Sequence, residues 1–313
     1  MIFAATVWSA IASAIVCATT GVLLSVYYVP SADVARDADG HPQVIRHATN
    51  APLVEAWGDT VALQGQYAAL SGVGRSASVA RVSVEVSIAN AWGGGILRAA
   101  HRASALACLL SIMAAIVVVA IGHTQAPSWL WPVSAVLLVA IVVAMWTGMV
   151  LPDDAYAEAS LGVVRAAIAD GIVGGAVLEG LTGRGITSVQ PLARTYAMHA
   201  WLLPIVLAGG LGLLVRRCGL SFTKQSLVVG LVVIGASIPV ALLRPDGTKA
   251  WYPFRAASML QEAFGSELAS YIVLAWLLAV ATIPWWQPRS GRWTMPVVVV
   301  GGILVIVLSA LLS

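Results

Sequence analysis

Two histidines lie inside apolar stretches of the sequence, where a polar imidazole is costly to bury. His101 occurs in GGGILRAAHRASALACLL and His199 in PLARTYAMHAWLLP, each near the start of a long apolar run. An ionisable side chain within a membrane segment indicates a functional site. Two imidazoles at matching depth on different helices are typical of the axial ligands of one haem iron. On these residues alone the alternative stays open, that each histidine only hydrogen-bonds a neighbouring helix.

The composition around these histidines predicts an all-α integral membrane protein. Of the 313 residues, 59% are hydrophobic and 10% are charged, and the mean hydropathy is +0.90. These values lie outside the range of soluble proteins. The formal net charge of +3 gives no reason to expect a nucleic-acid partner. We therefore expect membrane lipid around the chain and no nucleic acid.

Seven apolar stretches are long enough to cross about 30 Å of hydrocarbon as helices. The first has no Lys or Arg before its apolar core, so we expect a membrane span there rather than a cleaved signal peptide. The two histidines fall in the second and fourth spans. The seven predicted spans lie near residues 3–27, 97–122, 128–151, 196–215, 225–244, 266–286 and 294–312.

Basic residues in two connections predict the orientation. One connection holds Arg216, Arg217 and Lys224 and the other holds Arg289 and Arg292, and neither contains an acid. Short cytoplasmic loops are enriched in Lys and Arg. We therefore expect a multi-pass protein of the cytoplasmic (inner) membrane, with its N-terminus inside and its C-terminus outside.

Glycines near the outer ends of two other spans give a flat cofactor room to approach the backbone. They are Gly21 and Gly148, and helix packing is the alternative role for a lone glycine. A second haem on the same helix pair would need ligands fourteen residues beyond each histidine, about 21 Å along the helix. Those positions hold Ala115 and Leu213, which cannot bind iron. A second haem is therefore not expected.

The outer connection between the fifth and sixth predicted spans is rich in aromatic residues. It contains the sequence LLRPDGTKAWYPFRAASMLQEAFG. Such a stretch at the membrane surface could line a quinone pocket, although aromatic belts have a similar composition without a ligand. The candidates for this pocket are Lys249, Trp251, Tyr252 and Phe254.

Taken together, these segments resemble cytochrome b of the quinol–cytochrome c and quinol–plastocyanin oxidoreductases. The matching pieces, in the family's order, are TTGVLLSVYYVPSADVA, GGGILRAAHRASA, TGMVLP, LARTYAMHAWLLP and KAWYPFRAASML. The resemblance implies a haem-binding four-helix bundle over residues 1–215, with an enlarged outer loop at 31–95. It implies a three-helix C-terminal region over residues 216–313, with the family's eighth span missing.

The resemblance also implies which residues bind a cofactor. The two histidines match the axial ligands of the b haem nearer the outer side, and the two glycines match those that make room for it. Arg98 is the implied partner of a haem propionate, and Arg194 precedes the second histidine as Arg98 precedes the first. The implied haem-binding residues are His101, His199, Arg98, Arg194, Gly21 and Gly148.

Two departures from the family change the expected function. In the family, two glycines also make room for the inner haem, and the matching positions here hold Val7 and Ser134. The space for that haem is therefore lost together with its ligands. The family's Pro-Glu-Trp-Tyr motif appears as the four residues Lys249 to Tyr252, without the glutamate that helps to take protons from quinol. We therefore expect a subunit with one haem b that exchanges electrons between quinone and an outer-side redox partner.

The family also implies a larger assembly. The chain carries no iron–sulfur or c-type haem motif, so iron–sulfur or c-type cytochrome subunits would be separate proteins, and a homodimer is expected as in the family. The enlarged loop at 31–95 is the candidate contact with such a subunit. The alternative function is a scaffold subunit of a respiratory complex whose quinone site has degenerated.

Overall fold

The computed structural model of the chain describes mainly residues up to 222. The predicted spans near 225–244, 266–286 and 294–312 lie outside the described residues, apart from two single positions, as do the four quinone-pocket candidates. Among the described residues there is no β-strand, only an isolated bridge between Val34 and Ser78. The described residues are 2–36, 38–40, 78–122, 127–153, 157, 190–222, 228 and 235.

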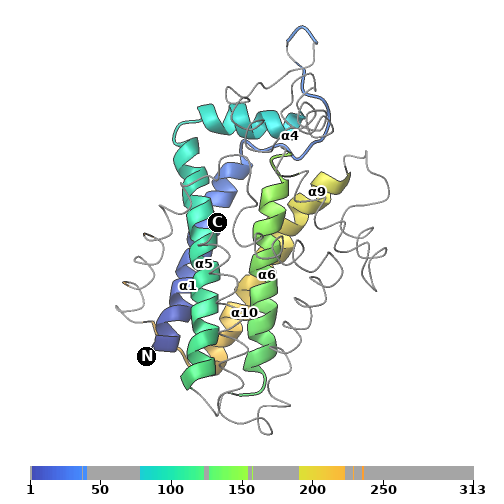
Figure 1. The fold of residues 1–313 in the computed structure, drawn as a ribbon. Helices are drawn as coiled ribbons and strands as arrows, with labels where there is room; N and C mark the ends of the chain where they lie inside the picture. Colours follow the sequence, from blue (N-terminus) through green and yellow to red (C-terminus); the bar gives the residue numbers. More distant parts are fainter. Residues whose placement is uncertain are drawn as a thin grey trace, which may run out of the picture.

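Four long helices match the first four predicted spans, which are confirmed as helices of membrane-spanning length and composition. The first three are α1 (Ile2–Ser25), α5 (Gly94–Gly122) and α6 (Leu130–Val150) (Figure 1). The fourth is built from three consecutive pieces with one π-helical turn in the middle. These pieces are α9 (Gln190–Ala197), η2 (Met198–Leu202) and α10 (Leu203–Cys218).

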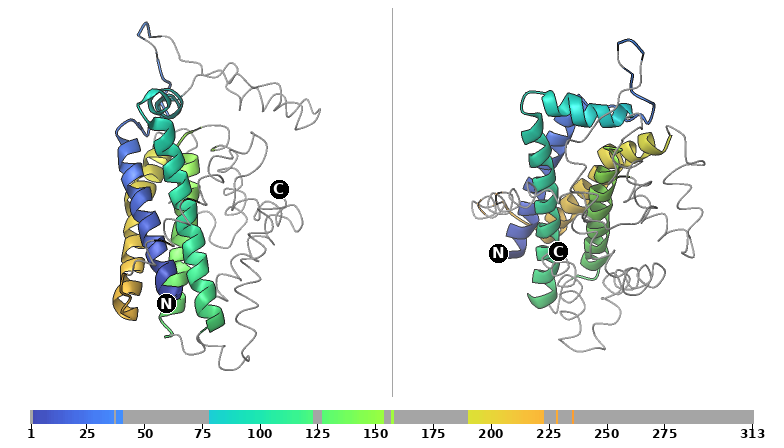
Figure 2. Two further views of the ribbon diagram at one scale, coloured as in Figure 1. Left: turned by 90° about the vertical axis from the view of Figure 1, so that its left-hand side faces the viewer. Right: turned by 45° about the horizontal axis from the view of Figure 1, so that its top comes forward.

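The long helices pack in two close pairs, α1 with α5 and α6 with α10. Further contacts join α5 to α6 and α1 to α10, so each long helix touches at least two others (Figure 2). Because successive helices run in opposite directions, the C-terminal ends of α1 and α6 lie beside the N-terminal ends of α5 and α9. Both histidines and both glycines of the expected site therefore lie at one end of these helices.

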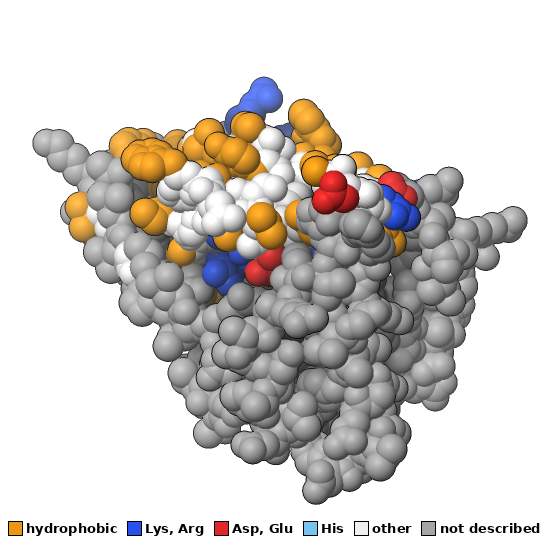
Figure 3. All heavy atoms as spheres, turned by 90° about the horizontal axis from the view of Figure 1, so that it is seen from above, with side chains coloured by type: hydrophobic (Ala, Val, Ile, Leu, Met, Phe, Trp, Pro, Cys, Tyr) orange, Lys and Arg blue, Asp and Glu red, His pale blue; other side chains and the backbone are white. Residues whose placement is uncertain are grey.

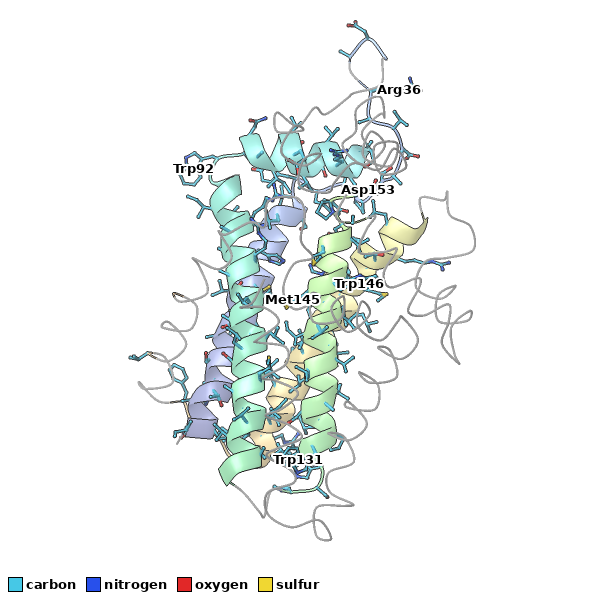
Figure 4. All side chains as sticks on the ribbon, viewed as in Figure 1. Arg36, Trp92, Trp131, Met145, Trp146 and Asp153 are labelled. Atoms are coloured by element: carbon cyan, nitrogen blue, oxygen red, sulfur yellow. The ribbon has the colours of Figure 1, made fainter. Side chains whose placement is uncertain are left out.

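Most of the space between the four helices is filled by apolar side chains. Trp131 and Leu137 on α6 are each only 1% exposed, and Trp131 lies at the opposite end of α6 from Asp153 (Figure 4). Four leucines of α10, spaced by three or four residues, turn the same face of that helix into this core. They are Leu203, Leu207, Leu211 and Leu214.

A short helix that the sequence did not predict lies across the histidine end of the long helices. It comprises α4 (Val79–Val82) and the π-helical turn η1 (Ser83–Ile88) (Figure 1). The side chain of Ser78 accepts a hydrogen bond from the Arg81 backbone N–H and caps its start. Viewed from this end, hydrophobic side chains are interspersed with a few acidic and basic ones (Figure 3). We call this end of the molecule the α4 end.

Three consecutive glycines lie at the junction of η1 and α5, and they differ in whether the backbone there could accommodate a side chain. Gly93 has a φ of +72°, which a residue with a side chain rarely adopts. A Cβ on Gly94 would overlap the carbonyl oxygen of Ile88, whereas a Cβ on Gly95 would meet nothing within 4 Å. The sharp corner therefore needs the first two glycines but not the third.

The pair Gly94→Ala and Gly95→Ala tests this account of the corner. We expect Gly94→Ala to lower the free energy of unfolding by about 1–3 kcal/mol, because the new methyl group must displace the Ile88 backbone. We expect Gly95→Ala to be neutral or to stabilise by about 0.5–1 kcal/mol, since alanine favours a helix more than glycine does. Thermal unfolding in detergent, followed by circular dichroism, measures both. Equal melting temperatures for the two variants would contradict the assignment.

Candidate functional site

His101 and His199 face each other at the α4 end of the long helices. Their ring centroids are 5.9 Å apart, and the ring planes make an angle of 64°. His101 lies near the start of α5, and His199 lies in the π-helical turn η2, where such turns often mark functional sites. The structure thus brings the two imidazoles face to face, and their sharing of one haem stays a prediction.

Each imidazole is hydrogen-bonded to a backbone carbonyl of the preceding long helix. Nδ1 of His101 lies 2.9 Å from the Cys17 carbonyl oxygen on α1, and Nδ1 of His199 lies 2.9 Å from that of Ala144 on α6. A carbonyl oxygen can only accept, so both Nδ1 atoms carry the hydrogen and donate it. The other ring nitrogen, Nε2, then presents its lone pair and is the atom that can bind a metal.

A glycine lies against each imidazole ring, four residues after the carbonyl that accepts its hydrogen bond. A Cβ on Gly21 would lie 3.1 Å from Cε1 of His101, and a Cβ on Gly148 would lie 2.8 Å from Cε1 of His199. The space beside each glycine is thus taken by an imidazole. Without a side chain at these positions, each ring can come close enough to its carbonyl to hydrogen-bond it.

A threonine precedes each glycine and places its hydroxyl beside the same Nδ1 atom. Oγ1 of Thr20 lies 3.3 Å from Nδ1 of His101, and Oγ1 of Thr147 lies 3.1 Å from Nδ1 of His199. These threonines were not among the site residues predicted from the sequence. The Thr-Gly dipeptide in both TTGVLL and WTGMVL was the pattern that could have indicated them.

The two half-sites differ at the residue that supplies the carbonyl. Ala144 has no polar side chain, whereas Sγ of Cys17 lies 3.6 Å from both Nδ1 and the backbone oxygen of His101. At this distance the thiol is a weak hydrogen-bonding partner. His101 therefore has one additional polar neighbour that His199 lacks.

Aromatic and apolar side chains cover the α4 end beyond the histidines. The Tyr28 hydroxyl donates a 2.8 Å hydrogen bond to the Leu151 carbonyl oxygen, and its ring lies 5.5 Å from that of Tyr196. Ala80 of α4 and Leu192 of α9 pack in the same cluster. Burial raises the pKa of the Tyr28 phenol well above its usual range, with Asp153 and Tyr196 adding to the effect, so the phenol stays protonated.

Comparison with known protein families identifies the chain. The sequence model of the family described as cytochrome b (N-terminal)/b6/petB matches residues 106–290, which is 185 of the 313 residues. The chain belongs to the cytochrome b family. The match includes His199 and begins five residues after His101, so the pairing of the two imidazoles comes from the geometry. No curated protein sequence matches this cytochrome b.

Membership of the cytochrome b family implies that the chain binds haem, and the histidine pair fits an iron held between two imidazoles. Metal–imidazole bonds are about 2 Å long, so rings whose centroids are 5.9 Å apart can both reach one ion. Within the described residues there is no group of three or more His, Cys, Asp or Glu side chains that could hold a metal ion. A protein site for zinc uses three or four such ligands, so the donor set suits haem better.

The two arginines expected near the haem differ in their surroundings. Arg98 is half-buried on α5, three residues before His101 and therefore on the same side of the helix, toward the α4 end. Arg194 is exposed on α9, five residues before His199. Arg98 thus has the better position to meet an anionic group beside the imidazoles.

At the depth where a second haem would lie, the four helices present no imidazole. Val7, Ala115 and Ser134 are each buried, at 1%, 7% and 7% exposure. Counting fourteen residues from His199 pointed to Leu213, but Leu213 is 37% exposed and Leu214, at 3%, faces the core instead. The π-helical turn η2 has i→i+5 hydrogen bonds and so inserts one extra residue into the helix. The residue that faces the core is therefore fifteen rather than fourteen positions after His199. The inward position is leucine in either case.

Proposed function

We propose that this cytochrome b carries a single b haem, with His101 and His199 as its axial ligands. The observation that carries the proposal is the facing pair of imidazoles, 5.9 Å apart, each donating Nδ1–H to a backbone carbonyl. Gly21 and Gly148 leave room for the rings, and Arg98 would neutralise a propionate. Arg194 would act at longer range from the exposed side of α9.

The packing of the remaining helix length supports one haem rather than two. Val7, Ala115, Ser134 and Leu214 are buried at the level where the resemblance to the family would put a second haem, and none of them can ligate iron. The core residues Trp131 and Leu137 are fully buried in the same half of the molecule. A macrocycle bound there would have to displace this core, at a cost typical of severe overpacking.

The proposed activity is electron exchange between the quinone pool and a redox partner on the outer face. A bound haem supplies a one-electron carrier at the α4 end, which we assign to the outer side from the basic loops. With no second haem about 21 Å deeper, electrons have no cofactor path across the bilayer within this chain. The protein would therefore work on one side of the cytoplasmic membrane, with its N-terminus in the cytoplasm.

The proposed partners follow from what the chain lacks. Cytochromes of this family sit in membrane redox complexes, so iron–sulfur or c-type cytochrome subunits are the proposed electron partners, and a homodimer is the proposed state. The quinone pocket would use Lys249, Trp251, Tyr252 and Phe254. The division into residues 1–215 and 216–313 stays a prediction.

The haem content of the purified protein tests the central proposal. Pyridine haemochrome measured against protein mass is expected to give one b haem per chain, because within the described part of the chain one pair of imidazoles, His101 and His199, faces inward at matching depth. A ratio near two would overturn the one-haem proposal. A ratio near zero after expression with sufficient haem supply would overturn haem binding itself.

A second candidate function is a scaffold subunit in which the haem is structural. The observation in its favour is the sequence Lys249, Ala250, Trp251, Tyr252, in which the family's glutamate is missing. Adding a reduced quinol to the purified complex separates the two candidates. Reduction of the haem within seconds supports electron exchange, and a haem that only dithionite reduces supports the scaffold.

A further inference from the structure

The threonines beside the two histidines have matching environments on two different helices. Thr20 is 8% exposed and Thr147 is 0% exposed. Each hydroxyl lies against the Nδ1 atom of a histidine that is already hydrogen-bonded to a carbonyl. Nothing in the family match assigns a role to either threonine, and two equal arrangements on α1 and α6 suggest a shared purpose.

Each threonine hydroxyl is itself fixed by the backbone of its own helix. Thr20 Oγ1 donates toward the carbonyl oxygens of Val16 and Cys17, at 2.8 and 3.0 Å. Thr147 Oγ1 donates toward those of Val143 and Ala144, both at 2.9 Å. Because the hydroxyl hydrogen points at these carbonyls, the oxygen's lone pairs remain free to accept from the imidazole.

Two acceptors on one Nδ1–H constrain a ring more than one acceptor does. A single hydrogen bond to a carbonyl fixes the position of Nδ1 but tolerates a broad range of ring orientations. A second oxygen near the same nitrogen, supplied by the residue three positions further along the same helix, favours one orientation of the ring plane. For His199 these two oxygens are the Ala144 carbonyl at 2.9 Å and the Thr147 hydroxyl at 3.1 Å.

We propose that Thr20 and Thr147 are positioning residues that hold the planes of His101 and His199 at their steep mutual angle. The inference rests on the proposed haem ligation by these two histidines. The angle between axial imidazole planes affects the d-orbital energies of ferric iron, and hydrogen bonds on the ligands affect the reduction potential. The two hydroxyls therefore influence the electronic state of a haem they do not touch.

The test replaces each threonine with valine, which keeps the shape and removes the hydroxyl. Thr20→Val and Thr147→Val are each expected to shift the largest g value of the low-spin ferric EPR signal and the midpoint potential, with one haem still bound. Thr20→Ser and Thr147→Ser keep the hydroxyl and are expected to stay close to the unmodified protein. EPR spectroscopy and redox titration of the purified haem protein measure both properties.

The chain offers a matched control beside Thr20. The Thr19 hydroxyl donates to the Ile15 carbonyl oxygen at 2.8 Å in the same helix, but Thr19 is exposed and has no hydrogen bond to either histidine of the described residues. Thr19→Val therefore removes an equivalent helix hydrogen bond away from the site. It is expected to leave the g value, the potential and the haem content unchanged.

Every outcome of this experiment bears on the proposal. Loss of haem in the valine variants with retention in the serine variants supports a hydroxyl that positions the ligand. Loss in both would mean that the site tolerates neither substitution even when the hydroxyl is kept, and it would overturn the proposal. Unchanged g values and potentials in both valine variants would overturn it too. A low-spin signal in the unmodified protein that is not bis-histidine would contradict the proposed ligands themselves, separately from the threonines.

Discussion

Replacing either histidine of the facing pair with alanine is expected to abolish haem binding. His101→Ala or His199→Ala removes one of the two imidazoles whose rings lie 5.9 Å apart. Removing a residue that only hydrogen-bonds a metal ligand already lowers metal affinity by about 10–100-fold. Removing the ligand itself is therefore expected to lower haem affinity by more than about 100-fold. The ratio of haem to protein in the purified variants, by pyridine haemochrome, measures the effect.

His123 supplies the control for the histidine variants. It directly follows the last residue of α5 in the sequence, and it is not one of the residues of the proposed site. His123→Ala is therefore expected to keep one haem per chain. Full haem content with an unchanged low-spin spectrum in His199→Ala would mean that another side chain binds the iron, and the proposed site would fall.

The second large effect is expected from adding one methyl group beside His199, the proposed haem ligand on the fourth helix. In Gly148→Ala the new Cβ would lie 2.8 Å from Cε1 of His199, so the ring must move away from the Ala144 carbonyl. Overpacking of this kind costs about 1–3 kcal/mol, and 1.4 kcal/mol is tenfold in binding. We expect haem affinity to fall by about tenfold, measured by haem titration of the apoprotein.

A graded series of glycine variants checks the cause of that loss. A Cβ on Gly21 would lie 3.1 Å from Cε1 of His101, so Gly21→Ala is expected to weaken haem binding less than Gly148→Ala does. A Cβ on Gly212 of α10 would meet nothing within 4 Å, so Gly212→Ala is expected to bind haem normally. An equal loss in Gly148→Ala and Gly212→Ala would show that contact with the imidazole is not responsible.

The sequence predicted the parts of this molecule that depend on bulk hydrophobicity. Long apolar runs identified the first four spans to within a few residues, except that the fourth helix begins earlier, at Gln190. The paired depth of His101 and His199 followed from their similar distances to the start of these runs. Both features arise from the cost of placing polar groups in hydrocarbon, which acts on every residue.

The parts that the sequence did not predict depend on contacts between helices. The backbone carbonyls of Cys17 and Ala144 could not be predicted as hydrogen-bond acceptors for the histidines. Every residue has a backbone carbonyl, so no residue type in the sequence indicates which ones are used. The π-helical turn at Met198–Leu202 shifts the inward position from Leu213 to Leu214, and a count of residues cannot detect that shift. Half of the ten residues of the short helix at the α4 end are buried, but they include Arg81 and Ser83, so no long apolar run marks this helix in the sequence.

Each histidine depends for its orientation on the helix that immediately precedes it among the long helices. α1 holds the ring of α5, and α6 holds the ring of the helix that follows it. Two successive helical hairpins thus each form one complete half of the proposed haem site. During biogenesis, each half can be ready as soon as its own hairpin has entered the bilayer, before any haem arrives. Haem insertion would then join two hairpins that are already folded. In the apoprotein, backbone amides at the contact between the hairpins would exchange hydrogen faster than amides at the contacts within either hairpin.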